Sequence, residues 1–180
     1  DFVQVSQELT AAVETDRERV ELLRSGAIAA QDELKDVRTA VHLLRRLVKI
    51  APTDRDALAR LDVLLTSINE PFSLIDVLEK RVAAGEEDGE LHGRLARRYE
   101  EFDDLPRALT HWRSLLEFEP DNRDALFAVQ AADDGVAGFS ARQRLLGLLT
   151  DNDPRRLELL RSQAEAAETL DRQDEAVVLW

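Results

Sequence analysis

The feature that most constrains the fold of this sequence is an internal repeat. The segment PTDRDAL at residues 52–58 returns as PDNRDAL at residues 120–126, 68 residues later. The next proline, Pro154, follows Pro120 by 34 residues, which is half of that spacing. Such a period predicts small, similar units that stack on their neighbours, because one unit cannot bury its apolar face alone.

Two further sets of residues share the longer spacing, so the repeat is not confined to the turns. The sets are Ala40, Ala108 and Ala176, and Leu44, Trp112 and Trp180. We therefore divide the chain into 34-residue units, of which alternate units resemble each other most. The expected units are residues 21–54, 55–88, 89–122, 123–156 and a partial unit 157–180, after residues 1–20 as the second helix of a preceding unit.

The composition predicts that every unit is helical. Helix-forming residues (Ala, Leu, Glu and Arg) dominate, whereas the 180 residues include only 7 Gly and 5 Pro. Pro52, Pro120 and Pro154 have no amide hydrogen and disfavour helix in the preceding residue, so each is expected to end a helix. The Asp or Asn that follows can cap the next helix, and Pro106 fits the first turn of another.

Residues 90–120 carry the resemblance to a known family. They match the tetratricopeptide-repeat pattern through Leu95, Ala96, Tyr99, Ala108, Trp112 and Pro120, with His92 where the family usually has Trp. The resemblance implies an all-α, right-handed α-solenoid of antiparallel helix hairpins, with a 34-residue period and a 68-residue double repeat. The chain looks like a segment of a large bacterial scaffold made of many such repeats.

Alternate units match the pattern unequally. The second and fourth units depart from it, with Asp62 and Gln130 at the slot for a small residue and Leu74 and Arg142 at the alanine slot. In the other units, small side chains let two helices approach and large ones fill the gaps between hairpins. The residues expected to pack the repeats are Leu95, Ala96, Tyr99, Ala108, Trp112, Leu115, Pro120, Ala40, Leu44, Pro52, Ala164, Ala176 and Trp180.

No pattern in the sequence points to catalysis, a metal or a cofactor. The chain has no cysteine, no glycine-rich phosphate loop and no serine nucleophile elbow. The three histidines, His42, His92 and His111, form no metal-binding motif and are interpreted as surface or interface residues. Acidic clusters fall at expected turns, where solvation and helix capping explain them. The sequence therefore predicts a protein that is not an enzyme.

The charge and hydropathy exclude two classes of partner. The net charge of −13 argues against nucleic acid, which is held by clustered cations. No apolar run approaches the roughly 20 residues that span a bilayer, so membrane insertion is not expected. The first residues lack the features of a signal peptide, and the chain is interpreted as a segment of a longer protein. Cytoplasm is favoured as the compartment, and periplasm stays open.

The resemblance implies that the first helices of the units line a concave groove for a peptide or a helix of a partner protein. The groove-facing residues are expected to include Arg60, Arg94, Arg97 and Phe127. The three arginines would suit an acidic partner segment. The alternative is that they pair with neighbouring carboxylates of the chain itself.

Three functional hypotheses follow. The first is a non-catalytic protein–protein interaction scaffold. The second is a regulatory or spacer arm of a larger protein whose catalytic domain lies outside this segment. The third is a self-assembling module that associates through uncapped terminal hairpins.

Overall fold

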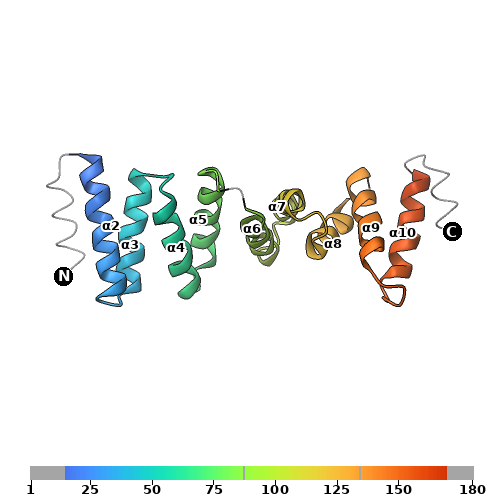
Figure 1. The fold of residues 1–180 in the computed structure, drawn as a ribbon, viewed down its shortest axis with the longest axis horizontal. Coiled ribbons are helices and arrows are strands. Elements are labelled where there is room, and N and C mark those ends of the chain that lie inside the picture. Colours follow the sequence, from blue (N-terminus) through green and yellow to red (C-terminus); the bar gives the residue numbers. More distant parts are fainter. Residues whose placement is uncertain (1–14, 87, 134, 170–180) are drawn as a thin grey trace. The chain divides into compact units, whose positions relative to one another are not determined.

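The structure, a computed structural model, describes residues 15–86, 88–133 and 135–169, which form helices and turns without a strand (Figure 1). The chain divides into two compact halves, residues 1–87 and residues 88–180. The described helices of the N-terminal half are α2 (Asp16–Asp32), α3 (Val37–Ile50), α4 (Arg55–Ser67) and α5 (Pro71–Ala83). Those of the C-terminal half are α6 (Gly89–Glu101), α7 (Leu105–Phe118), α8 (Arg123–Ala132), α9 (Val136–Leu148) and α10 (Arg156–Thr169).

The helices pair into hairpins. Contacts are most extensive within the pairs α2/α3, α4/α5, α6/α7 and α8/α9, whose members are joined by short turns. Within each half, successive pairs also touch, through α3 and α4, α7 and α8, and α9 and α10. The prediction of an all-α protein built from antiparallel helix hairpins is therefore confirmed.

The turns contain the capping residues that the sequence predicts. After Pro52, the side chain of Asp54 accepts a hydrogen bond from the backbone N–H of Ala57 (3.0 Å) at the start of α4. After Pro120, Asn122 accepts one from Ala125 (3.2 Å) at the start of α8. Each cap satisfies a backbone donor that the first turn of a helix leaves without an intrahelical partner.

The core of each hairpin combines small and large side chains at helical spacing. Of the residues expected to pack the repeats, those buried are Ala40, Leu44, Leu95, Ala96, Tyr99, Ala108, Trp112, Leu115 and Ala164. Pro52 and Pro120 are exposed in the turns that they form. Ala176 and Trp180 lie outside the described residues.

The first described helix differs from the expected division of the chain. Helix α2 begins at Asp16, so residues 16–20 are its first turns rather than the end of a preceding helix. The side chain of Thr15 accepts a hydrogen bond from the N–H of Glu18 (3.3 Å), which caps this start. Asp16 and Glu18 also place negative charge at the positive end of the helix dipole. Residues 1–14 lie outside the described part of the chain.

Two of the four departures from the repeat pattern, Asp62 and Arg142, are buried polar groups, whereas Leu74 is buried and apolar and Gln130 is half-buried. Asp62 on α4 is 4% exposed and is ion-paired with Arg81 on α5, which also pairs with Glu86 (2.7 Å). Arg142 on α9 is 1% exposed, and its Nε donates to Oε1 of Gln163 on α10 (3.3 Å). The second hairpin of each half therefore uses a polar contact where the repeat pattern uses a small residue. A bilayer-spanning helix is not found among the described helices.

Candidate functional site: a groove lined by α6, α7 and α8

The C-terminal half contains an open hollow of about 500 Å³, which we call the α6/α8 groove. It is lined by Arg97 and Glu100 of α6, Trp112 of α7, and Asp124, Phe127 and Ala128 of α8. A smaller hollow of about 230 Å³ shares three of these residues and extends along α7. Because first helices α6 and α8 supply most of the lining, this is the surface on which the sequence predicts partner binding.

Trp112 is held in a fixed orientation at the base of the groove. Its side chain is 2% exposed, and its indole N–H donates to Oε1 of Glu100 at 2.7 Å. The guanidinium carbon of Arg97 lies 5.7 Å from the centre of the indole ring. This distance allows a cation–π attraction, which brings the Arg97 side chain over the aromatic wall.

An exposed ion pair crosses the groove. Nη2 of Arg97 lies 3.1 Å from Oδ2 of Asp124, and the two side chains are 55% and 67% exposed. A pair this exposed contributes only about 0–1 kcal/mol. A ligand carboxylate could therefore take the place of Asp124 at little cost.

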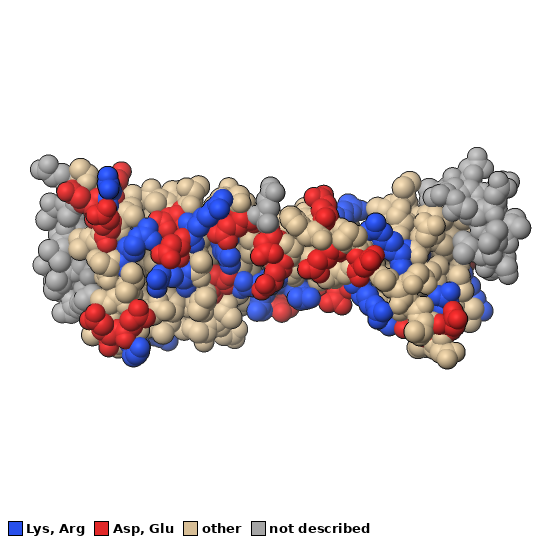
Figure 2. All heavy atoms as spheres, in the orientation of Figure 1, with Lys and Arg blue, Asp and Glu red and all other residues tan. Residues whose placement is uncertain are grey.

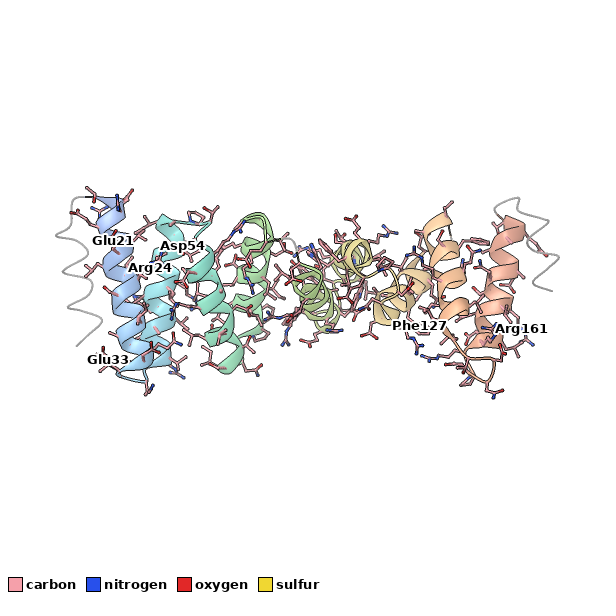
Figure 3. All side chains as sticks on the ribbon, viewed as in Figure 1. Glu21, Arg24, Glu33, Asp54, Phe127 and Arg161 are labelled. Carbon is pink, nitrogen blue, oxygen red and sulfur yellow. The ribbon has the colours of Figure 1, made fainter. Side chains whose placement is uncertain are left out.

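Phe127, which is labelled in Figure 3, forms the other aromatic wall. The guanidinium carbon of Arg155 lies 4.7 Å from the ring centre. Arg155 is fixed in turn by Asp153, with Nε···Oδ1 and Nη2···Oδ2 distances of 3.0 and 2.9 Å. Hydrogen bonds from the side chain and then the backbone of Arg155 lower the pKa of Asp153 to about 2.

The corresponding face of the N-terminal half carries ion pairs. Nε of Arg60 donates to Asp56 at 3.3 Å, and Arg24 of α2 reaches both Asp54 and Asp56 (Figure 3). Burial alone would lower the pKa of Arg24, but hydrogen bonds and attraction from the two carboxylates raise it above its usual value. Arg60 therefore pairs with a neighbouring carboxylate of the chain, which was the alternative to its facing a ligand.

The four residues expected to face a groove are thus used differently. Arg97 and Phe127 line the same hollow, whereas Arg60 belongs to the other half. Arg94 is half-buried and has interactions of its own. Acidic and basic side chains are interspersed over the face drawn in Figure 2, in keeping with the ion pairs found along the described helices.

The sequence interpretation missed a buried histidine pair in hairpin α6/α7. His92 and His111 are each 8% exposed, with their Nδ1 atoms 3.1 Å apart, so one ring donates and the other accepts. The ring of Tyr99 stacks on His111 at a centroid distance of 5.6 Å. His42, by contrast, is exposed, as expected. Within residues 15–86, 88–133 and 135–169, no three His, Asp or Glu side chains gather closely enough to hold a metal ion.

Comparison with known proteins identifies the fold. No family model and no curated protein matches the sequence. Among solved structures, a MamA protein superposes with a TM-score of 0.50 at 16% identity, over 89% of this chain and 87% of that chain. YrrB, described as a TPR protein with an unusual peptide-binding site, gives a TM-score of 0.49 at 14% identity, over 92% and 89%. A fragment of MamA from Desulfovibrio magneticus RS-1 gives 0.46 at 15%, over 89% and 90%. The described part of the chain is thus an array of helix hairpins, similar in fold to the MamA protein.

Proposed function

We propose that this chain is a non-catalytic interaction scaffold, and that its α6/α8 groove binds a peptide or a helix of a partner protein. The observation that carries the proposal is the groove itself, an open hollow with two aromatic walls and an exposed arginine. None of its lining side chains is a hydroxyl, thiol or imidazole that could act as a nucleophile.

The chemistry of the groove favours an acidic partner segment with an apolar anchor. Arg97 can form a bidentate, charge-assisted pair with a carboxylate. Phe127 is partly exposed and offers an aromatic surface of the kind that commonly anchors an interface, whereas Trp112 is 2% exposed and forms the floor of the groove. The open form of the hollow suits one face of a helix or a short extended segment, since small-molecule sites enclose most of their ligand.

Affinity capture from the source cells, followed by mass spectrometry, tests this proposal. The wild-type protein is compared with an Arg97→Glu/Phe127→Ala variant, an Arg60→Glu/Arg94→Glu/Arg97→Glu variant and an Arg161→Glu control. Arg161 is exposed on α10 and lies outside the groove lining. Circular dichroism checks that each variant is folded.

We expect a specific partner that the wild type and the control retain and both groove variants lose. Arg60→Glu as a single variant should have a smaller effect, because Arg60 lies outside the lining of the α6/α8 groove. If all variants capture a partner equally, the binding surface lies outside the α6/α8 groove. If the wild type captures no specific partner, the spacer or regulatory-arm hypothesis is favoured.

A further inference from the structure

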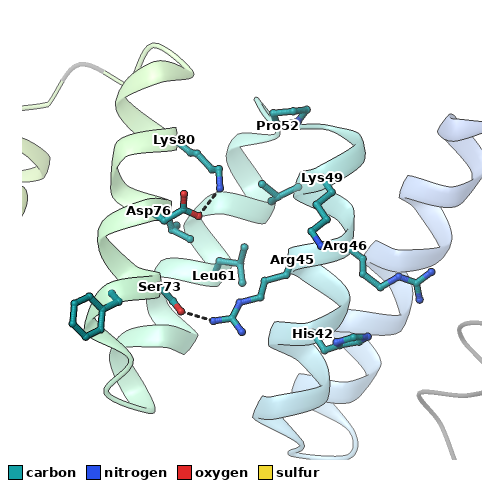
Figure 4. Close-up of a pocket in the computed structure, with 12 residues that line it drawn as sticks. His42, Arg45, Arg46, Lys49, Pro52, Leu61, Ser73, Asp76 and Lys80 are labelled. Atoms are coloured by element: carbon teal, nitrogen blue, oxygen red, sulfur yellow. Dashed lines mark hydrogen bonds and ion pairs between the residues drawn. The ribbon is translucent and has the colours of Figure 1, made fainter.

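A second groove lies in the N-terminal half, on the face formed by second helices α3 and α5 (Figure 4). It has a volume of about 650 Å³, and we call it the α3/α5 groove. Its apolar lining comes from Val48, Pro52, Leu61 and Val77. Phe72, whose side chain is 73% exposed, lies at its edge.

The α3/α5 groove is basic in a chain that is strongly acidic. Helix α3 contains four cationic residues and no Asp or Glu, although the whole chain has a net charge of −13. Three of the four (Arg45, Arg46 and Lys49) line the groove, and α5 adds Lys80. Asp76 is the one acidic side chain in the lining. Four cations around an apolar floor attract an anionic ligand that also has apolar surface.

Some of these cations are paired within the described residues, and at least one is not. Arg45 donates to Glu70 and to Ser73, both at 2.6 Å, and Lys80 is paired with Asp76 (Figure 4). Lys49 is exposed and makes no hydrogen bond or ion pair with the described part of the chain. Its ammonium group is therefore available to a ligand.

The same groove recurs in the C-terminal half at the spacing of the double repeat. The α7/α9 groove, of about 400 Å³, is lined by Arg113, Leu116 and Val129, which stand 68 residues after Arg45, Val48 and Leu61. Arg144 occupies the position that corresponds to Asp76. The recurrence preserves the apolar floor and the arginine. The acidic position of the first groove becomes basic in the second, whereas Glu117 stands at the position that corresponds to Lys49.

Packing alone does not account for this recurrence. Stacked hairpins produce similar hollows wherever they repeat, but helix packing does not require exposed cations around them. Arg113 pairs with Asp133 at 2.8 Å and Arg144 donates to the carbonyl of Pro120 at 3.1 Å, so both hold ordered positions beside the floor. Both double repeats therefore present a positively charged apolar groove on their second helices.

We propose that each of these second-helix grooves binds an acidic peptide segment of a partner, with an apolar side chain on the floor and carboxylates at the cations. The two grooves share no lining residue with the α6/α8 groove, so this proposal does not depend on the previous one. Electrostatic attraction of this kind weakens as added salt shortens the screening length.

A peptide titration tests the proposal directly. The probe is a short labelled peptide of Glu and Asp with two Leu, and its control is the same peptide with Gln and Asn in place of the acids. Calorimetry or fluorescence anisotropy gives affinity and stoichiometry at about 0.05 M and at about 0.5 M salt. Only at the higher concentration does the screening length fall well below about 10 Å. The variants are Lys49→Glu/Phe72→Ala and Arg113→Glu/Arg144→Glu, with Arg17→Glu and Arg161→Glu as controls on exposed positions outside these grooves.

In the Arg97→Glu/Phe127→Ala background, which removes the α6/α8 groove, we expect two acidic peptides to bind each chain, at least about tenfold more tightly than the neutral peptide and more weakly at high salt. Each groove variant should lose one site, the combined variant both, and the controls neither. Because Lys49 and Phe72 are exposed, their replacement should leave the melting curve unchanged.

Three results would overturn the proposal. One is equal affinity for the acidic and neutral peptides. Another is loss of binding only in the Arg97→Glu/Phe127→Ala variant, which would assign the peptide to the α6/α8 groove. The third is a wild-type dimer that Lys49→Glu dissociates, since the occupant would then be a second copy of the chain.

Discussion

Ala108 illustrates how a single residue sets the geometry of a hairpin. It is 2% exposed on α7, and the large side chains of Tyr99 and Trp112 are buried in the same hairpin. The 68-residue spacing to Ala40, together with the family pattern, was enough to predict that this position takes a small residue. The size of the side chain at such a slot can therefore be predicted from the sequence, because it follows from the repeat spacing and the family pattern.

Replacing Ala108 with Trp tests this at the residue scale. We expect the free energy of unfolding to fall by about 1–3 kcal/mol or more, because the core has no room for the larger side chain. A thermal melt should show a clearly lower midpoint. Leu105→Trp is the control, since Leu105 is 59% exposed on the same helix. An unchanged melt of the Ala108 variant would refute this placement.

The ion pair of Asp153 with Arg155, which lies beside the α6/α8 groove, should make the stability of the fold depend on pH. Arg155 lowers the pKa of Asp153 to about 2, below the ordinary value of about 3.9. A lowered folded pKa means that the ionised carboxylate stabilises the fold above pH ~4, and that this contribution is lost as the pH falls toward 2. We expect Asp153→Asn to melt lower than the wild type at pH 7, with the difference vanishing near pH 2. A difference that is independent of pH would contradict this assignment.

Side-chain partners were harder to predict than packing slots. The sequence left open whether Arg60 and Arg97 face a ligand or a neighbouring carboxylate, and the helix positions alone could not decide. Arg97 pairs with Asp124, 27 residues away on the next hairpin. The His92–His111 contact likewise joins two helices at a spacing of 19 residues, for which no short motif exists. Such contacts depend on how the two helices are rotated about their axes.

At the scale of an element, the hairpin turns were predictable because proline and capping residues act locally. The polar contacts inside the second hairpin of each half were not, since the repeat pattern classes Asp62 only as a departure. In the structure, this departure is one partner of a buried ion pair between α4 and α5.

Removing one partner of that pair should be costly. We expect Arg81→Met to lower the free energy of unfolding by about 3–5 kcal/mol, because Asp62 stays buried without its cation. The Asp62→Leu/Arg81→Met double variant should recover part of the loss, since it removes the buried Asp62 carboxylate, although Glu86 still lacks the cation with which it pairs in the wild type. Chemical denaturation measures both values. If the double variant is no more stable than the single one, the pair is not what holds this hairpin.

At the scale of the whole molecule, the period of 34 residues implies that each unit is stabilised mainly by contacts close to it in the sequence. In a repeat array, each hairpin is stabilised by its own contacts and those with its immediate neighbours. We expect the Ala108→Trp variant to lose protection from hydrogen exchange mainly in α6, α7 and α8, with α2 and α3 little affected. Loss of protection to the same extent in every helix would indicate one cooperative core instead.

Selection from a displayed random-peptide library shows whether this array binds peptide segments of other proteins. The immobilised wild-type protein is compared with the Arg97→Glu/Phe127→Ala variant and the Arg161→Glu control. We expect the wild type to enrich acidic peptides with an aromatic or aliphatic anchor, and the groove variant alone to lose at least one of the enriched classes. Failure to enrich any peptide class, or the same classes on all three proteins, would contradict this expectation.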